Sequence, residues 1–172
     1  MEVLEAITTR RSIKKYKSDD VPKELIEKIC QAGISAPSGL NKQSPVILAV
    51  RNKSLRDRLS KLNAGNDPFH RSDPFYGAPV VLVVVADKNV PTYLYDGALV
   101  MENMLLAAHA LGLGACWIHR AKETFEMFEG KQILKDLGLE GDYEGIGNCI
   151  IGYSAMMPTD KPRLENRIYY LD

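Results

Sequence analysis

Residues 80–86, VVLVVVA, are apolar without interruption, and most of them are β-branched. A strand with one face in water alternates apolar and polar residues, whereas this run does not alternate. The run therefore predicts a central strand that is covered on both faces. Helices are expected on both sides of the sheet to which it belongs.

The elements predicted around this strand are helices and strands in mixed order. Apolar spacing predicts helices over residues 2–9, 22–34, 93–111 and 122–138, and a short helix capped by Ser54. Further strands are expected at 46–50, 114–119 and 148–154. Without strict alternation, this order favours an α+β fold, a three-layer α/β/α sandwich, over a doubly wound sheet.

Composition indicates one ordinary globular domain over residues 1–172. The chain is 45% hydrophobic and 26% charged, and its 22 Lys and Arg balance 22 Asp and Glu, so we expect no nucleic acid or anionic membrane as a partner. Cys30, Cys116 and Cys149 are far apart in apolar surroundings. They are expected to be reduced core residues of a cytoplasmic protein.

Residues 97–118 are long enough to be considered as a membrane span. The segment contains Glu102, Asn103 and His109, and a carboxylate at mid-span costs about 2.5–3.5 kcal/mol on insertion scales. A helix that is buried in the core or against a second subunit is therefore expected instead. The first residues lack the apolar region of a signal peptide.

Several common functional motifs are absent from the sequence. GLGACW, residues 112–117, contains G-x-G, but it follows a predicted helix and enters a strand, which inverts the context of a dinucleotide site. The sequence contains no P-loop, no nucleophile elbow and no zinc-binding spacing of Cys and His. No metal is expected.

Polar residues remain in four groups outside the predicted core. Arg forks and a Ser hydroxyl suit a phosphate monoester, while amides suit a ring with both donors and acceptors. Arg11 and Lys15 fit a solvated surface at least as well, and Ser38 and Asn41 are also ordinary turn residues. The four groups are Arg10, Arg11, Ser12 and Lys14; Pro37, Ser38, Asn41 and Gln43; residues 117–120; and Lys161 and Arg163.

Four stretches in this order resemble the nitroreductase family of flavin enzymes. They are RRSIKKY at 10–16, APSGLNKQSP at 36–45, Asp96 with LLAAHALGLGACWI at 105–118, and IGYSAMMPTDKPR at 151–163. The resemblance covers essentially the whole chain. It implies a nitroreductase-type sandwich whose central mixed sheet is flanked by helices, in an intertwined homodimer with shared active sites.

The resemblance also implies that FMN binds at the subunit interface. Arg10, Ser12, Lys161 and Arg163 match positions that clamp the phosphate, Arg11 takes the neighbouring position, and Lys14 matches a basic residue near the pyrimidine edge. Residues from the other subunit, namely Pro37, Ser38, Gly39, Asn41 and Gln43, are expected to reach the flavin. Cys116, Trp117, Ile118 and His119 match the segment beside the ring, where a backbone N–H contacts N5.

The implied activity is the transfer of two electrons from NADH or NADPH through flavin N5 to a nitro compound, a quinone or a related acceptor, in a ping-pong cycle. No side chain is expected to act as a nucleophile, because the cofactor carries the chemistry and Lys14 tunes it. The alternative is a non-catalytic dimer that stores or senses FMN.

The loop over residues 63–79 is a candidate lid, and Phe69, His70, His119 and Arg120 are expected to line the substrate pocket. The aromatic tail, residues 168–171, is expected to cross onto the other subunit.

Overall fold

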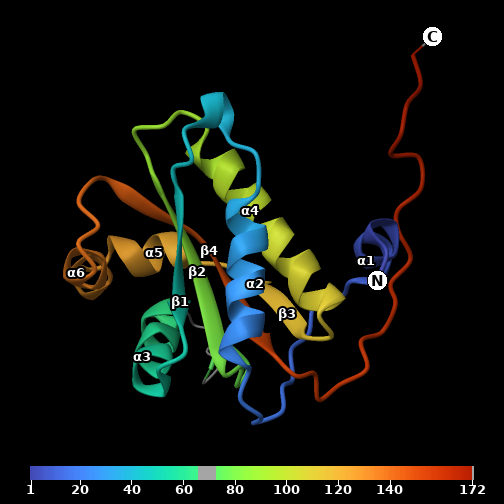
Figure 1. Ribbon diagram of the computed structural model, residues 1–172, viewed down its shortest axis with the longest axis horizontal. Helices are drawn as coiled ribbons and strands as arrows, with labels where there is room; N and C mark the ends of the chain where they lie inside the picture. Colours follow the sequence, from blue (N-terminus) through green and yellow to red (C-terminus); the bar gives the residue numbers. More distant parts are fainter. Residues whose placement is uncertain (66–72, 172) are drawn as a thin grey trace.

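The fold is built on a four-stranded sheet in a computed structural model that describes residues 1–65 and 73–171. The strand order is β1-β2-β4-β3, so β2 and β4 are central (Figure 1). The strands are β1 (Pro45–Val50), β2 (Val80–Asp87), β3 (Gly114–Ile118) and β4 (Tyr143–Gly152).

Strand β2 contains the run VVLVVVA and is buried over its whole apolar length. Val80, Leu82, Val84 and Ala86 belong to one hydrophobic core, and Val81, Val83 and Val85 belong to another on the opposite face. Successive side chains of a strand point to opposite faces. The prediction of a central strand that is covered on both sides is confirmed.

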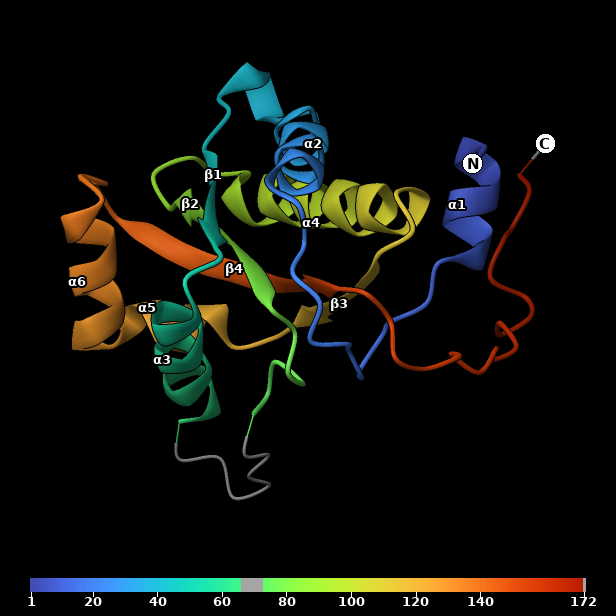
Figure 2. The same cartoon turned by 60° about the horizontal axis from the view of Figure 1, so that its bottom comes forward.

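Helices cover the two faces of the sheet unequally. Figures 1 and 2 show α2 (Lys23–Ile34) and α4 (Tyr93–Ala110) over one face, and α3 (Lys53–Ala64), α5 (Ala121–Glu126) and α6 (Phe128–Asp136) over the other. The short helix α1 (Val3–Thr9) lies away from both layers, beside the C-terminal segment. The expected three-layer α+β sandwich is confirmed.

The direction of the strands differs from the mixed sheet that we expected. β1 with β2, β2 with β4, and β4 with β3 all pair antiparallel. In the described residues, parallel pairing is confined to one isolated bridge between Ser12 and Ala115. Burial on both faces produces an unbroken apolar run in either direction, so the sequence pattern reported the burial of the strand and not its direction.

The helix expected at 122–138 is two helices. Met127 has φ −67° and ψ 153°, an extended conformation that separates α5 from α6. The two helices cross closely at Gly130, where a Cβ atom would lie 2.1 Å from the carbonyl oxygen of Thr124. The prediction of one continuous helix was wrong. The contact at Gly130 requires the chain to turn at Met127, and the charged sequence of residues 122–138 gives no sign of that turn.

The cap of α3 is Asn52 and not Ser54. The Asn52 side chain accepts a hydrogen bond from the Leu55 N–H at 2.9 Å. Ser54 lies inside the first turn, two residues further on. Both residue types cap helices, so composition alone did not distinguish the two positions.

Helix α4 packs across the sheet and places its middle in the core. Met101, Met104 and Ala108 are fully buried, whereas Tyr95 and Leu99 on its other side are exposed. Among the described helices, none has both the length and the apolarity that a membrane crossing requires.

The aromatic tail forms no strand within this chain. Residues 168–171 lack regular structure, and Tyr169 and Tyr170 are 81% and 84% exposed. Figure 1 shows this end of the chain, in red, running past α1 and away from the sheet. The strand-like pattern was therefore not sufficient to form a strand, because no neighbouring strand of the same sheet lies beside it.

Candidate functional site

A cationic cavity lies between the segment after α1 and the C-terminal arm, by which we mean residues 155–171. Its volume is about 430 Å3, within the range of small-molecule sites. The first and last groups of predicted residues therefore meet in space. The lining residues are Arg10, Arg11, Ser12, Lys14, Met156, Pro158, Thr159, Lys161 and Arg163.

Main-chain hydrogen bonds hold the two ends of the chain together at this cavity. The Ile13 N–H donates to the carbonyl of Ala115 at 3.0 Å, which fixes the N-terminal segment along the outer edge of β3. Lys17 N–H donates to Tyr153 O at 2.9 Å, and Ala155 N–H donates to Lys15 O at 2.9 Å. The arm thus begins beside the basic segment.

Arg10 carries a buried donor that the described residues do not satisfy. Its Nε atom is buried and makes no hydrogen bond within them. The nearest acid is Glu102, whose Oε1 lies 3.9 Å from that Nε, too far for a hydrogen bond. A buried guanidinium donor without a partner is costly, so an anionic oxygen in the cavity would fit this position.

Arg11 is committed to the arm. Its Nε donates to Asp160 Oδ1 at 2.9 Å, and its Nη2 donates to the same oxygen. Its Nη1 donates to the carbonyl oxygens of Thr8 and Arg10, each at 2.8 Å. The Arg11 guanidinium, through its hydrogen bonds and its charge, holds the pKa of Asp160 below the ordinary carboxyl value.

Lys14 also lines the cavity, and its ammonium group lies over an aromatic ring. Its Nζ is 5.9 Å from the centre of the Tyr76 ring, and its N–H donates to Met156 Sδ at 3.4 Å. Lys15 and Lys17 are exposed and do not line the cavity. The basic segment therefore divides into cavity-lining and solvent-facing cations.

The predicted ring segment, Cys116 to His119, begins beside this cavity. Because β3 is an edge strand and Ala115 holds Ile13, the backbone beyond Ala115 continues along the same outer edge. The Cys116 side chain is buried in the core, whereas Trp117 is half-buried and packs over Gly147, leaving no room there for a Cβ. A ligand would therefore meet backbone groups and the Trp117–His119 end of the strand.

The loop over residues 37–43 is held by its own hydrogen bonds and by α4. Buried Asp96 accepts from the Gly39 N–H at 3.0 Å and from Thr92 Oγ1 at 2.8 Å. The Gln43 N–H donates to Ser38 Oγ at 3.0 Å. Leu40, Asn41 and Gln43 adopt positive φ, an uncommon conformation for residues other than glycine. The loop is therefore a defined structure, and a cavity of about 200 Å3 lies beneath it beside Pro37 and Ser38.

Within one chain, this loop and the cationic cavity do not meet. Asp96, which anchors the loop, is in the first turn of α4, and His109, which bonds Thr9 beside Arg10, is in its last turn. At 1.5 Å per residue, these two helix positions are about 20 Å apart. The two groups of predicted residues occupy opposite ends of one helix.

His109 contacts Thr9, the residue before Arg10, and its surroundings lower its pKa. Its Nε2 is 2.8 Å from Thr9 Oγ1. Burial lowers the pKa of His109, and the positive charge of Arg10 lowers it further, with a smaller contribution from Arg11 and an opposing one from Glu5. His109 therefore does not add a cation to this region at neutral pH.

The residues predicted to line a substrate pocket are divided between described and undescribed parts of the chain. Phe69 and His70 lie outside the described residues. Exposed His119 and half-buried Arg120 follow β3, and the carbonyl of His119 accepts from Asn63 Nδ2 at 2.8 Å. Arg120 Nη1 donates to the carbonyl of Ala64 at 3.3 Å. These two residues thus lie at the C-terminal end of α3.

A polar network around Asp73, which we did not predict from the sequence, holds the turn that precedes β2. Asp73 accepts hydrogen bonds from Arg56, from Ser60 and from the N–H groups of Phe75 and Gly77. Burial alone would raise the pKa of Asp73, but these hydrogen bonds outweigh it and lower the pKa. The network holds the turn at 73–77 and so places the Tyr76 ring beside Lys14. In the sequence, Arg56 and Asp73 look like ordinary surface charges.

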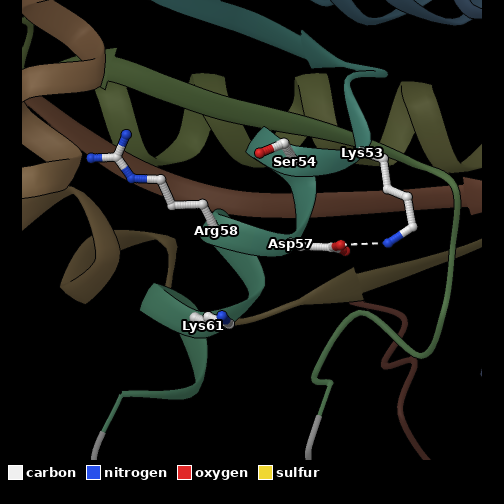
Figure 3. Close-up of a pocket in the computed structure, with 5 residues that line it drawn as sticks. All are labelled: Lys53, Ser54, Asp57, Arg58 and Lys61. Carbon is white, nitrogen blue, oxygen red and sulfur yellow. Dashed lines mark hydrogen bonds and ion pairs between the residues drawn. The ribbon is translucent and has the colours of Figure 1, made fainter.

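A third hollow, of about 590 Å3, lies along α3 (Figure 3). Its polar side chains come from one exposed helix face: Lys53, Ser54, Asp57, Arg58 and Lys61. Lys53 Nζ pairs with Asp57 at 2.6 Å, and Arg58 pairs with Glu129 at 3.7 Å. Among the described residues, those that line this hollow are solvated and offer a ligand neither a buried donor nor an aromatic wall. In the described part of the chain, no group of three or more His, Cys, Asp or Glu is placed to hold a metal.

Sequence comparison relates the chain to one protein family. A sequence model described as the nitroreductase family matches residues 7–153. A relative from Methanothermobacter thermautotrophicus, which carries the name NADH dehydrogenase/NAD(P)H nitroreductase, is 36% identical over 126 residues. That alignment covers 68% of this chain and 60% of the relative, so the chain spans less than two thirds of that protein. The FMN reductase of Bacillus subtilis, named for NAD(P)H, is 26% identical over 95% of this chain and 70% of its own length.

Solved structures agree over the full chain. A nitroreductase from Bacteroides fragilis, determined with bound FMN, superposes with a TM-score of 0.88 at 28% identity and covers 100% of both chains. A second nitroreductase with bound FMN, from Desulfitobacterium hafniense, gives the same TM-score and coverage at 25% identity.

Proposed function

Because this chain belongs to the nitroreductase family, we propose that it is an FMN-dependent oxidoreductase and that residues 1–172 form one FMN-binding domain. The reaction proposed is the ping-pong transfer of two electrons from NADH or NADPH to a nitro compound, a quinone or a related acceptor. Bound FMN supplies that electron transfer, and the chain supplies binding, orientation and electrostatics.

The observation that carries the proposal is the cationic cavity at the meeting of the chain ends. FMN ends in a phosphate monoester, which carries a charge of about −1.5 to −2 at neutral pH. Arg10 offers a buried Nε donor that has no hydrogen-bond partner among the described residues, and Ser12, Lys161 and Arg163 line the same cavity. These groups would bind the phosphate oxygens through charge-assisted hydrogen bonds.

Two further groups would act on the flavin ring. Lys14 would place a fixed positive charge at the pyrimidine edge, which stabilises the added negative charge of a reduced ring. The backbone of Cys116 to His119, on the outer edge of β3, would offer its N–H groups to the ring edge. His119 and Arg120 would border the space left for the acceptor.

We propose that the complete site needs two chains. The loop at 37–43 lies about 20 Å from the cavity's end of α4, so the loop of a second chain would have to cover the ring. Apolar side chains on α1 and the arm are exposed, Leu4 at 76% and Tyr169 at 81% among them, and these would be buried in a homodimer. The small-molecule acceptor would enter this shared site.

Anaerobic stopped-flow mixing tests the activity. Protein reconstituted with FMN is mixed with NADH or NADPH, flavin absorbance is followed, and oxidised acceptors are then supplied one at a time. Rapid bleaching followed by reoxidation is expected. Flavin that stays oxidised with both nicotinamides would instead indicate a storage or sensing role, and failure to take up FMN would reject both.

Light scattering tests the shared site. The full chain is expected at twice the monomer mass of 19.2 kDa. A monomer that still binds FMN tightly would contradict the two-chain site. We also propose that the protein is cytoplasmic, since its three cysteines are free.

A further inference from the structure

The ion pair of Arg11 and Asp160 joins segments that are 149 residues apart in the chain. Resting on the proposed function, we propose that this pair is a latch: Asp160 is a positioning residue that holds Lys161 and Arg163 at the phosphate site. Arg11 then acts through the arm and does not itself bind the phosphate.

The guanidinium of Arg11 has its donors engaged by acceptors of this chain. Nε and Nη2 both reach Asp160 Oδ1, and Nη1 reaches two carbonyl oxygens at the end of α1. The side chain is only 23% exposed, and these hydrogen bonds restrain its position. A planar guanidinium that is held in this way gives the arm a rigid attachment point.

Asp160 directly precedes Lys161, Pro162 and Arg163. The proline ring fixes its own φ and restricts the residue before it to extended conformations. Anchoring Asp160 therefore sets the direction in which both cations leave the anchor. In the described part of the arm, Asp160 is also the last residue with a hydrogen bond to another segment.

The latch and simple electrostatics predict opposite changes in FMN affinity when the charge of Asp160 is removed. Asp160 is a carboxylate beside a site for an anion, so Coulomb repulsion alone would make its removal strengthen FMN binding. If Asp160 instead orders the arm, its removal adds an ordering cost to binding, and FMN affinity falls. The sign of one substitution separates the two effects.

The main experiment compares Asp160→Asn with the matched control Glu165→Gln, which removes an exposed acid from the same arm. FMN and riboflavin dissociation constants are measured by flavin fluorescence. Asp160→Asn is expected to raise the FMN constant about three- to fivefold, the effect of one solvent-accessible ion pair. The riboflavin constant should not change, because riboflavin lacks the phosphate, and Glu165→Gln should not weaken FMN binding. Unchanged or tighter FMN binding in Asp160→Asn, or equal weakening of both flavins, would overturn the latch.

A double-mutant cycle assigns the role of Arg11. Arg11→Gln should weaken FMN binding in the wild-type background and cost little more when Asp160 is already Asn. If Arg11 bound the phosphate directly, its loss would cost as much in both backgrounds, and the latch would be rejected.

Trypsin cleavage after Arg163 in the flavin-free protein tests the latch independently of FMN. Asp160→Asn should be cut faster than both wild type and Glu165→Gln, and equal rates would reject the latch. If the wild-type chain binds no FMN but is still cut more slowly than Asp160→Asn, the proposed function is rejected and the latch is not.

Discussion

The Lys14 ammonium lies 5.9 Å from the centre of the Tyr76 ring. This contact joins the basic segment after α1 to the turn before β2, and the hydrogen bonds of Asp73 hold that turn. An exposed cation over an aromatic ring gains about 0.5–1 kcal/mol. The residue assigned to tune the flavin is therefore restrained by a second segment of the chain.

Removing the charge of Lys14 should make the bound flavin harder to reduce. In Lys14→Met the reduced ring loses a stabilising cation, so its midpoint potential should fall by roughly 20–60 mV, equivalent to about 1–3 kcal/mol for two electrons. Spectroelectrochemical titration measures this. Lys15→Met, an exposed neighbour, is the control and should leave the potential unchanged. An unaltered potential in Lys14→Met would place the lysine away from the ring.

Arg163→Ala should mainly release FMN. Loss of one charge-assisted contact of about 1.5–3 kcal/mol corresponds to a 10- to 150-fold rise in the dissociation constant. Arg167→Ala removes the same kind of side chain from the same arm but does not touch the cavity, so its affinity should match wild type. Equal affinities in wild type and Arg163→Ala would remove Arg163 from the phosphate site.

Gly39→Ala should displace the loop from α4. A Cβ atom at Gly39 would lie 2.4 Å from Thr92 Oγ1, and relieving such a clash costs about 1–3 kcal/mol. FMN affinity should fall while the phosphate cavity stays intact. Lys42→Ala, at an exposed position just after the same turn, provides the comparison. Wild-type affinity in Gly39→Ala would show that the loop does not cover the flavin.

Asp73→Asn should lower stability by about 1–3 kcal/mol at neutral pH, because it loses charge-assisted acceptors at a half-buried position. The folded state depresses the pKa of Asp73, so its contribution is present above the ordinary carboxyl value of 3.8 and is lost as pH falls through the lower folded value. Urea unfolding from pH 7 to pH 3 should therefore show the difference between wild type and variant narrowing in acid. A difference that stays constant over this range would exclude the carboxylate as its source.

The layers of the fold could be predicted because they follow from local patterns. The apolar run at 80–86 reports burial on both faces, and residues 93–111 show the length and apolarity of a core helix, which α4 confirms. Strand direction could not be predicted, since it depends on which connections close the sheet. The break at Met127 likewise depends on Gly130 meeting α5, a contact between two helices.

The candidate site could be predicted only in its residue types and by resemblance. Nothing in the sequence itself places Arg10 beside Lys161, because the bonds that join the chain ends are main-chain bonds such as Ala155 to Lys15. The roles of these residues stay predictions. Asp160 was missed because its partner is 149 residues away, and Tyr76 because its turn depends on the buried Asp73 network.

The separation of the loop and the cavity by the length of α4 has a genetic consequence. Under the shared-site proposal, a chain with Gly39→Ala damages the site built on its partner's cavity, whereas a chain with Arg163→Ala damages the site at its own. When the two weakly binding variants pair, both lesions fall in the same site and the other site is assembled from intact parts. In such a mixed dimer, one of the two sites should therefore bind FMN with wild-type affinity, an interallelic complementation that neither variant shows alone.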